Sequence, residues 1–480
     1  MRIARAIVGA MALLSVASCS LTKTSFDECK TNEQCRGAFG NLQVCGGDGI
    51  CEGIKPNARC SVAFPEDLLA RPKNFPKAII VGVLMDRSVE SQRAREDAVR
   101  LAARQVNEEK GVDGRAFGVV FCDVAEDVKY DSLKRTEAAV ASARYLADAV
   151  GVPAIVGPSS STDAIAVFDA LKTSNVLVIS PSATSPALTG RDVANATDAS
   201  PGLLWRTAPP DTLQGEAMSR HIRAAFPQVS SVAVINERGP YGDALAKVFA
   251  DSFAREGRTV KPFAFDTGST GQRDAAVVDA GGSALPVVLF ISSQTSDAVA
   301  FLNSAATLQS YATVNMFLTD SAANKDLLSG ASGARALFPR VAGSRPAVPA
   351  GPVFELFRTS FTAAFKQDPN TFSFVPHTFD AAWLTFYGAA YALKRENNIT
   401  GGAIARGLRR LSAGPEVRIG PGTWTGIVTE LGAGKSINVT GASGVLDFDP
   451  VTEETSGLVD IWKISADGAA IETLSTIDPR

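Results

Sequence analysis

The chain has 480 residues, of which 45% are hydrophobic and 20% charged, and its formal net charge at pH 7 is −3. That length suits about two or three domains, and neither the charge nor any Lys/Arg stripe interleaved with aromatic residues indicates a nucleic-acid partner. The two histidines, His221 and His377, lie in no metal-ligand spacing, so we expect neither a metal nor a cofactor.

The N-terminus has the pattern of a secretion signal. Positively charged residues precede the apolar stretch 6–14 (AIVGAMALL), and small residues then lead to Cys19 in the sequence VASC. This ending resembles the lipobox of bacterial lipoproteins, which predicts that residues 1–19 are a lipoprotein signal peptide and that Cys19 carries the lipid. An ordinary signal-peptide cleavage site is the alternative. Ser20 in place of Asp favours the outer membrane over the inner one, so the resemblance implies a lipid-anchored, periplasm-facing protein of the bacterial cell envelope.

Six further cysteines indicate an oxidising compartment, because an even number packed mainly into residues 29–60 is typical of a disulfide framework. A zinc site formed by the first four is the alternative, but their spacing contains no CxxC and no nearby histidine. Residues 20–76 are therefore predicted to form a small Cys-rich stalk and a linker. If the first four cysteines pair among themselves, the last two are left and could join the stalk to the main body. The six are Cys29, Cys35, Cys45, Cys51, Cys60 and Cys122.

Strands and helices alternate after the linker. The run 78–84 (AIIVGVL) is apolar throughout, as in a strand buried on both faces. In the helix predicted after it, Ala98, Leu101, Ala102 and Val106 share one face. This alternation predicts a parallel α/β sheet. The elements predicted in this half are strands at 78–84, 116–122, 153–157 and 176–180 and helices at 91–109 and 132–149.

The stretch 152–188 is the centre of this half. It reads as strand, polar loop, helix, strand, with hydroxyl groups clustered where each strand ends, which is the edge where open parallel sheets bind small ligands. Ser159, Ser160 and Ser161 stand at the start of the helix, where free N–H groups and the helix dipole favour an anion such as a carboxylate. Ordinary helix capping is the alternative for these serines. The second loop, SPSAT at 180–184, repeats the pattern.

The same rhythm restarts after residue 206 and predicts a second α/β lobe of comparable size. Near its end, Phe379, Trp383 and Phe386 form the apolar stripe of a strong helix at 376–394, which is expected to be core. The other elements predicted here are helices at 212–226 and 242–256 and strands at 231–236, 260–265, 286–292, 314–319, 339–343, 444–448 and 458–464.

Four segments in this order resemble the branched-chain amino-acid-binding family of type I periplasmic binding proteins, which feeds ABC importers. They are IVGPSSST…VLVISPSAT (155–184), PYGDALA (240–246), HTFDAAW (377–383) and GVLDFDP (444–450). The resemblance implies a two-lobed α/β fold with a helix-flanked parallel sheet in each lobe. It also implies three crossings between the lobes, near 207–210, 340–346 and 449–456. Lobe 1 is expected to comprise 77–208 plus 345–449, and lobe 2 to comprise 209–344 plus 450–480.

The resemblance also implies where a ligand binds. Hydroxyl and backbone groups of the first lobe would hold an amino acid's carboxylate and ammonium, an acidic residue of the second lobe would complete the ammonium site, and a tyrosine would line the cleft. The chain departs from the family at 292–294, where Ser-Ser-Gln replaces an aromatic, and at 85–92, which carries charge. The side-chain pocket is therefore altered, and the ligand need not be leucine or its relatives. The expected ligand-binding residues are Ser159, Ser160, Ser182, Thr184, Tyr241 and Asp320.

Enzymatic chemistry is not expected. The chain has no GxSxG elbow, and GAGKS at 432–436 lacks the first glycine of a phosphate loop. The carboxylates Asp211, Asp243 and Asp380 are expected to be helix-start residues in solvent rather than an acid–base pair.

Two functions follow from the sequence. The first is a solute-binding lipoprotein that captures an amino-acid-like molecule between two lobes and delivers it to an ABC-type permease. The alternative is an envelope-tethered lipoprotein that uses the same fold to bind a protein partner. The candidate ligand residues favour the first function, and the Cys-rich stalk favours the second.

Overall fold

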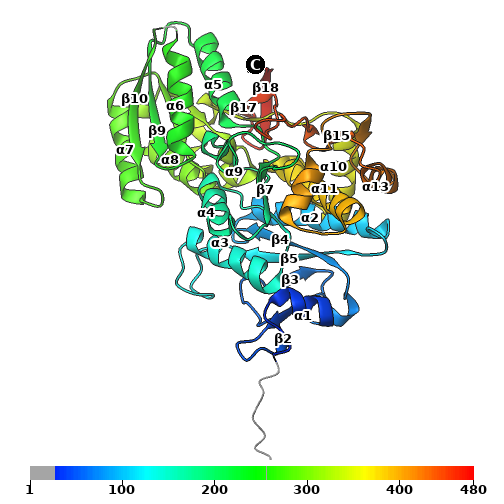
Figure 1. Ribbon diagram of the computed structural model, residues 1–480. Helices are drawn as coiled ribbons and strands as arrows, with labels where there is room; N and C mark the ends of the chain where they lie inside the picture. Colours follow the sequence, from blue (N-terminus) through cyan, green and yellow to red (C-terminus); the bar gives the residue numbers. More distant parts are fainter. Residues whose placement is uncertain (1–26, 256) are drawn as a thin grey trace, which may run out of the picture.

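Two helix-covered sheets divide the chain into two lobes, and a small N-terminal module lies at the end of the first lobe that is remote from the second (Figure 1). This computed structural model describes residues 27–255 and 257–480. Cys19 and the predicted signal peptide lie outside the described residues. Among the residues described, no helix combines the length and apolar character that a membrane crossing requires.

The sheet of lobe 1 has six strands in the order β3-β5-β4-β6-β7-β8, of which β3 is antiparallel to its neighbour and the rest are parallel. Every residue of β4 is buried, because Val81 and Val83 enter the core on one face while Ile80 and Leu84 enter the core on the other. The strands are β3 (Val62–Phe64), β4 (Ile79–Met85), β5 (Phe117–Asp123), β6 (Ala154–Val156), β7 (Leu177–Ser180) and β8 (Leu204–Arg206).

Helices from two separate parts of the chain cover this sheet. One face carries α3 (Arg135–Arg144) and α4 (Ser161–Leu171). The other face carries α2 (Glu90–Glu108) together with helices that return from the C-terminal part: α10 (Pro352–Phe365), α11 (Val375–Tyr391), α12 (Gly401–Leu408) and α13 (Trp424–Gly432). A small sheet lies beside them, with strands β14 (Glu416–Arg418), β15 (Asn438–Gly441) and β16 (Gly444–Val445).

The sheet of lobe 2 has seven strands in the order β10-β9-β11-β12-β13-β17-β18, parallel up to β13 and antiparallel after it. One face packs against α5 (Asp211–Ala225) and α6 (Gly242–Ala254), and the other packs against α7 (Thr270–Gly282), α8 (Thr295–Thr307) and α9 (Lys325–Gly330). The strands are β9 (Ser231–Glu237), β10 (Thr259–Phe265), β11 (Val287–Ile291), β12 (Asn315–Leu318), β13 (Val341–Pro346), β17 (Val459–Ile464) and β18 (Ile471–Ile477).

The two-lobed α/β fold predicted from the sequence is confirmed, with two local corrections. The predicted linker between residues 61 and 77 contains β3, which pairs with β5 and so extends the sheet of lobe 1. The crossing expected at 340–346 is wrong by a few residues, because those residues form β13 and pair with β17 up to Pro346. The chain passes between the lobes after β8, after β13 and again between β16 and β17.

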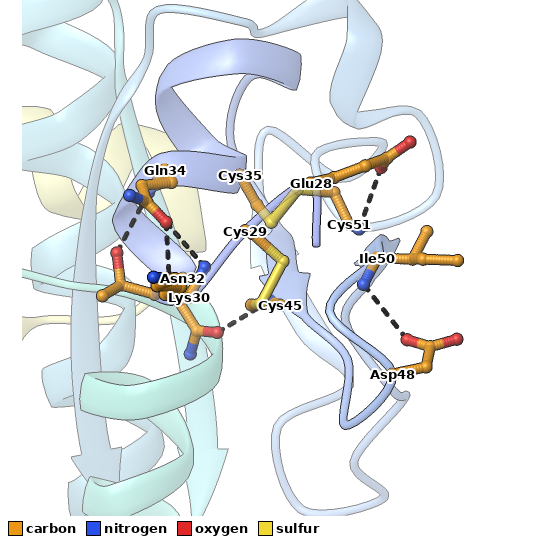
Figure 2. Close-up of a disulfide and its surroundings, with 11 residues drawn as sticks. Glu28, Cys29, Lys30, Asn32, Gln34, Cys35, Cys45, Asp48, Ile50 and Cys51 are labelled. Carbon is orange, nitrogen blue, oxygen red and sulfur yellow. Dashed lines mark hydrogen bonds between the residues drawn. A yellow bond between two sulfur atoms is a disulfide. The ribbon is translucent and has the colours of Figure 1, made fainter. Parts of the chain in front are cut away.

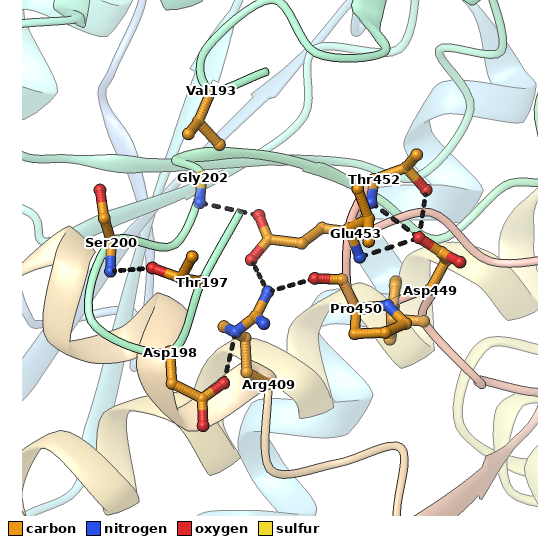
Figure 3. A network of polar contacts seen from close by, with 12 residues as sticks. Val193, Thr197, Asp198, Ser200, Gly202, Arg409, Asp449, Pro450, Thr452 and Glu453 are labelled. Atoms are coloured by element: carbon orange, nitrogen blue, oxygen red, sulfur yellow. Dashed lines mark hydrogen bonds and ion pairs between the residues drawn. The ribbon is translucent and has the colours of Figure 1, made fainter. Parts of the chain in front are cut away.

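A polar network holds the last of these crossings against lobe 1 (Figure 3). Arg409 donates to the carboxylate of Glu453 at 2.6 Å and to that of Asp198 at 2.8 Å. The other oxygen of Glu453 accepts the backbone N–H of Gly202 at 2.7 Å. Arg409 and Glu453 are both at least nine-tenths buried, so this segment moves with lobe 1 up to Glu453.

The N-terminal module is a disulfide-linked unit made of α1 (Asn32–Phe39), β1 (Gln43–Cys45) and β2 (Cys51–Gly53). The predicted disulfide framework is confirmed. Figure 2 shows the pairs Cys29–Cys45 and Cys35–Cys51, and the third pair is Cys60–Cys122. The four cysteines of the zinc alternative are therefore bonded to one another. The module is also docked on lobe 1, since Asn32 Nδ2 donates to the carbonyl of Asp148 at 2.8 Å and Asn41 Nδ2 donates to that of Ala78 at 2.8 Å.

Candidate functional site

A cavity of about 360 Å³ lies between the lobes and is lined by both. It opens at the carboxyl ends of the parallel strands, where each strand gives way to a loop and the next helix. Lobe 1 contributes Val89, Ser91, Gln92, Arg95, Arg135, Ser159, Ser160, Ser161, Ser182, Ser373 and Phe374. Lobe 2 contributes Tyr241, Ser293, Gln294, Thr295, Ser296, Val299, Asp320, Ser321, Asn324 and Asp326.

The serines of lobe 1 are held in place by the two loops that follow β6 and β7. Ser160 is the N-cap of α4, and its hydroxyl accepts the backbone N–H of Asp163 at 3.1 Å. The hydroxyl of Ser182 donates to the carbonyl of Ser159 at 2.9 Å, which joins the two loops. The first N–H groups of α4 therefore face a fixed, hydroxyl-rich wall, which suits an anionic group of a ligand.

The acidic group of lobe 2 is Asp320, which is 4% exposed. Its Oδ1 accepts hydrogen bonds from the hydroxyl of Tyr241 at 2.5 Å and from Nε2 of Gln214 at 3.0 Å. Burial raises the pKa of Asp320 above its ordinary value, against the opposing effect of these two hydrogen bonds. Because both side-chain bonds reach Oδ1, the lone pairs of Oδ2 are left for a cation in the cavity.

Asp211 lies behind this group, contrary to the expectation that it would be exposed to solvent. It is fully buried at the start of α5, and its backbone N–H donates to the carbonyl of Thr184 at 2.8 Å. Burial and the like charge of Asp320 raise the pKa of Asp211 well above its ordinary value. The expectation for Asp380 is also wrong. Its buried carboxylate accepts the N–H groups of Ala442 and Ser443, so it anchors the β15–β16 turn.

Five of the six residues proposed from the sequence line the cavity. They are Ser159, Ser160, Ser182, Tyr241 and Asp320. Thr184 is not among the residues that line it. Its side chain is 1% exposed, so it supports the second loop from behind instead of facing the cavity.

Sequence reasoning missed Arg95, which projects from α2 to the cavity wall. Its Nη1 donates to the hydroxyl of Ser182 at 3.0 Å and its Nη2 to the carbonyl of Ser373 at 3.2 Å. The guanidinium also lies over the ring of Phe374, 5.2 Å from its centroid. A signal was present in the sequence, since Arg95 precedes Ala98 by three residues and Ala102 by seven and so falls on the apolar face of the helix.

The lobes also contact each other around the cavity. Ser373 of lobe 1 donates its hydroxyl proton to the carbonyl of Ala323 in lobe 2 at 3.0 Å. Lys325 of lobe 2 pairs with Glu90 at the start of α2. These contacts join the lobes directly, so a change in the angle between the lobes would break them.

Fold and site together define a two-lobed binding protein with a cavity between its lobes. Residues 94–467 match the family described as the receptor family ligand binding region, and the chain therefore belongs to that family.

Among curated relatives, the Leu/Ile/Val-binding protein BraC3 of Rhizobium johnstonii is 29% identical over 153 residues, which cover 32% of this chain and 37% of that protein. The matched part thus spans less than half of that relative. Among solved structures, a leucine-binding protein from Thermotoga maritima has a TM-score of 0.65 and 17% identity, covering 84% of this chain and 99% of the other. A branched-chain amino-acid transporter substrate-binding protein from Streptococcus pneumoniae, in complex with isoleucine, has a TM-score of 0.64 and 18% identity, covering 84% and 100%. At such identities the structural likeness shows the fold.

Proposed function

We propose that this chain is an extracytoplasmic solute-binding lipoprotein that captures an amino-acid-like molecule between its lobes and delivers it to an ABC-type importer. The observation that carries the proposal is the arrangement of charge across the cavity. Asp320 of lobe 2 faces a wall of lobe 1 that holds the N-terminus of α4 and Arg95. A zwitterion can satisfy both walls at once, with its ammonium on Asp320 and its carboxylate on lobe 1.

Closure of the cleft makes this charge complementarity necessary for binding. As the lobes close, the charges of a bound ligand leave water, so each needs a partner of opposite sign. The chain supplies binding groups, and the described residues that line the cavity include no histidine, cysteine or lysine, which favours capture over catalysis. Relatives that are named as leucine-, isoleucine- or valine-binding proteins support the same class of ligand.

The membrane link in this proposal is the predicted lipid on Cys19. Replacing Cys19 by Ala should leave the protein uncleaved or release it from the membrane fraction. The measurement is membrane fractionation together with sequencing of the mature N-terminus. A variant that partitions with membranes like the parent and has the same N-terminus would show that the lipobox interpretation is wrong.

The docked N-terminal module favours a second candidate, an envelope lipoprotein that binds a protein partner through the same fold. Two disulfides hold this module together, and the third, Cys60–Cys122, and hydrogen bonds such as that of Asn32 fix it to lobe 1. Nothing in solute capture requires the module.

Native mass spectrometry of protein purified without residues 1–19 separates the two candidates. A captured solute should appear as an additional mass that is lost on unfolding, and its accurate mass should match an amino acid or a close analogue. Protein that carries no such mass, and that gains none after incubation with a mixture of free amino acids, would favour the partner-binding alternative.

A further inference from the structure

The cavity holds a buried cation that no carboxylate neutralises directly. Arg95 is 9% exposed, and it forms no ion pair with any residue in 27–255 or 257–480. Its two hydrogen-bond acceptors, the hydroxyl of Ser182 and the carbonyl of Ser373, are neutral, and its Nε has no acceptor within the described part of the chain. Burial lowers the pKa of Arg95 to about 10, so the guanidinium stays charged at neutral pH.

The position of Arg95 makes this cation a binding group. It contacts Ser182, whose hydroxyl joins the two ligand-facing loops of lobe 1, and it lies on the same wall as the first N–H groups of α4. Arg135 lines the same wall, but its Nε lies 3.0 Å from the carboxylate of Asp163, so its charge is already paired. An anion bound against Ser182 would therefore meet one uncompensated guanidinium, with donors arranged in a planar fork that matches a carboxylate.

The opposite wall favours polar groups on the rest of the ligand. Polar side chains of lobe 2 line the cavity, among them Gln294, Thr295 and Asn324. Among the described residues of this lobe that line it, Val299 is the only aliphatic one. These groups are held by bonds within the lobe, since Thr295 donates to the carbonyl of Ser321 and Asn324 donates to Thr295. They present a fixed polar surface with one aliphatic neighbour, so a branched aliphatic side chain would cover polar groups and find little apolar surface to pack against. A polar side chain can form hydrogen bonds with the acceptor oxygens of this surface.

We propose that the cleft selects an amino acid with an uncharged, hydrogen-bonding side chain over the branched-chain amino acids, and that Arg95 is the residue that holds its carboxylate. This inference rests on the proposed function, since it names the ligand class of the same site. The charges agree with a neutral side chain: the ligand's carboxylate answers Arg95 and its ammonium answers Asp320. Of the other charged residues of the lining, Arg135 is paired with Asp163. Asp326, for which the described residues provide no ion pair, has the cations Lys325 and Arg93 in its neighbourhood.

Isothermal titration calorimetry with L-glutamine, L-serine and L-leucine as probes tests the selection. Wild-type protein should bind at least one of the two polar amino acids about tenfold more tightly than L-leucine, or better. Tighter binding of L-leucine would overturn the inference and leave the proposed function intact. Absence of binding by all three probes, together with absence of any amino acid from the mass spectrum, would overturn both.

Arg95→Gln tests the residue, with Arg104→Gln as the matched control because Arg104 is an exposed arginine on the same helix. Loss of a buried charge partner should weaken binding of the preferred polar probe at least about thirtyfold, equivalent to about 2 kcal/mol. The control should bind as the wild type does, and Arg95→Lys should lose less than Arg95→Gln because it keeps the charge without the planar fork.

An α-amide probe distinguishes a binding role of Arg95 from a purely structural one. When the probe's carboxylate is replaced by its α-amide, wild-type affinity should fall sharply, whereas Arg95→Gln should discriminate little between the two probes. Equal discrimination by both proteins would overturn the assignment of the carboxylate to Arg95. If Arg95→Gln does not fold, judged by its thermal unfolding, the same comparison is made with Arg95→Met, which also removes the charge and keeps a long side chain.

Discussion

Asp320 is a buried carboxylate that is held by hydrogen bonds within lobe 2, and it is also the acidic group that lobe 2 offers to a ligand in the cavity. Tyr241 and Gln214 both donate to Oδ1, so their bonds fix the side chain without using Oδ2. Asp211 behind it adds a like charge and makes ionisation of the pair costly in the empty protein. A ligand ammonium would relieve that cost, so binding and charge are coupled at this residue.

Asp320→Asn should therefore weaken binding of the captured amino acid strongly. Leaving a buried ammonium without its partner typically costs about 2–5 kcal/mol, which is a loss of at least about thirtyfold in affinity. The folded protein should tolerate the change, because Asn keeps an Oδ1 acceptor and removes a charge next to Asp211. Calorimetry measures the affinity, and Asp279→Asn on the exposed side of α7 is the control. Unchanged affinity would mean that Asp320 only begins the short helical turn Asp320–Ala322.

Glu237 should make stability depend on pH. The residue is 3% exposed at the end of β9, and burial raises its pKa from 4.5 to about 7, although Ser292 and Ser293 donate to it and Asp297 lies nearby. The folded protein therefore takes up a proton before the unfolded chain does, and stability should rise as the pH falls from about 8 to about 5. Arg273 pairs with Asp297 at 2.8 Å, so that neighbour keeps its own counter-ion.

The variant Glu237→Gln should be more stable than the wild type at about pH 8, by up to an amount on the order of 3 kcal/mol, and the difference should vanish near the pKa of the unfolded chain. Urea unfolding at a series of pH values measures it. Parallel pH profiles for the two proteins would rule out Glu237 as the source.

At this scale the sequence predicted the site only in part. Serines that directly follow strands could be placed at the cavity because the carboxyl ends of parallel strands meet at one edge, and Ser159 and Ser182 lie there. Thr184 was placed at the cavity from its match to the family's second loop, but the structure buries it. Arg95 was missed because a helix pattern shows which residues share a face, and it cannot show that the N-terminal part of that face extends beyond the core into the cleft.

At the level of single elements, length and apolar content decided what could be predicted. The strands β4 and β11 and the helices α2 and α11 have strong patterns, and the structure has them within one to three residues of the predicted bounds. The helices α7 and α8 were missed, and α7 ends in Ala-Gly-Gly. Among the strands that were missed, β3 has three residues, too few for any period, and β18 has no buried face.

The disulfide Cys60–Cys122 should be the most stabilising of the three covalent links. It joins residues 62 positions apart, whereas Cys29–Cys45 joins residues 16 apart. In the chain-entropy model these loops correspond to about 4 and about 3 kcal/mol respectively. The double variant with Cys60→Ala and Cys122→Ala should therefore unfold at clearly lower urea concentration than the wild type.

The matched control for this prediction is the double variant with Cys29→Ala and Cys45→Ala, which opens the module and leaves β3 bonded to β5. Its effect on the unfolding of lobe 1 should be smaller, because the module contributes no strand to the main sheet. Equal effects of the two double variants on lobe 1 would contradict this account of the third disulfide.

For the whole molecule, three crossings and a few direct contacts connect the lobes. The pair between Lys325 and Glu90 and the bond from Ser373 to lobe 2 join the lobes beside the cavity. The two lobes and the parallel sheets could be predicted from the alternation of elements, because each sheet needs helices on both faces. The docking of the N-terminal module could not, since it depends on single bonds such as that of Asn32 to the carbonyl of Asp148.

The central claim is that one amino-acid-like molecule binds between the lobes. Equilibrium dialysis of the purified protein against individual radiolabelled amino acids tests it most directly, with an excess of the unlabelled compound as competitor. The account predicts saturable binding of one molecule per chain for at least one amino acid, and loss of that binding in Asp320→Asn. Retention of no amino acid by correctly folded protein, or binding that does not saturate and resists competition, would contradict it.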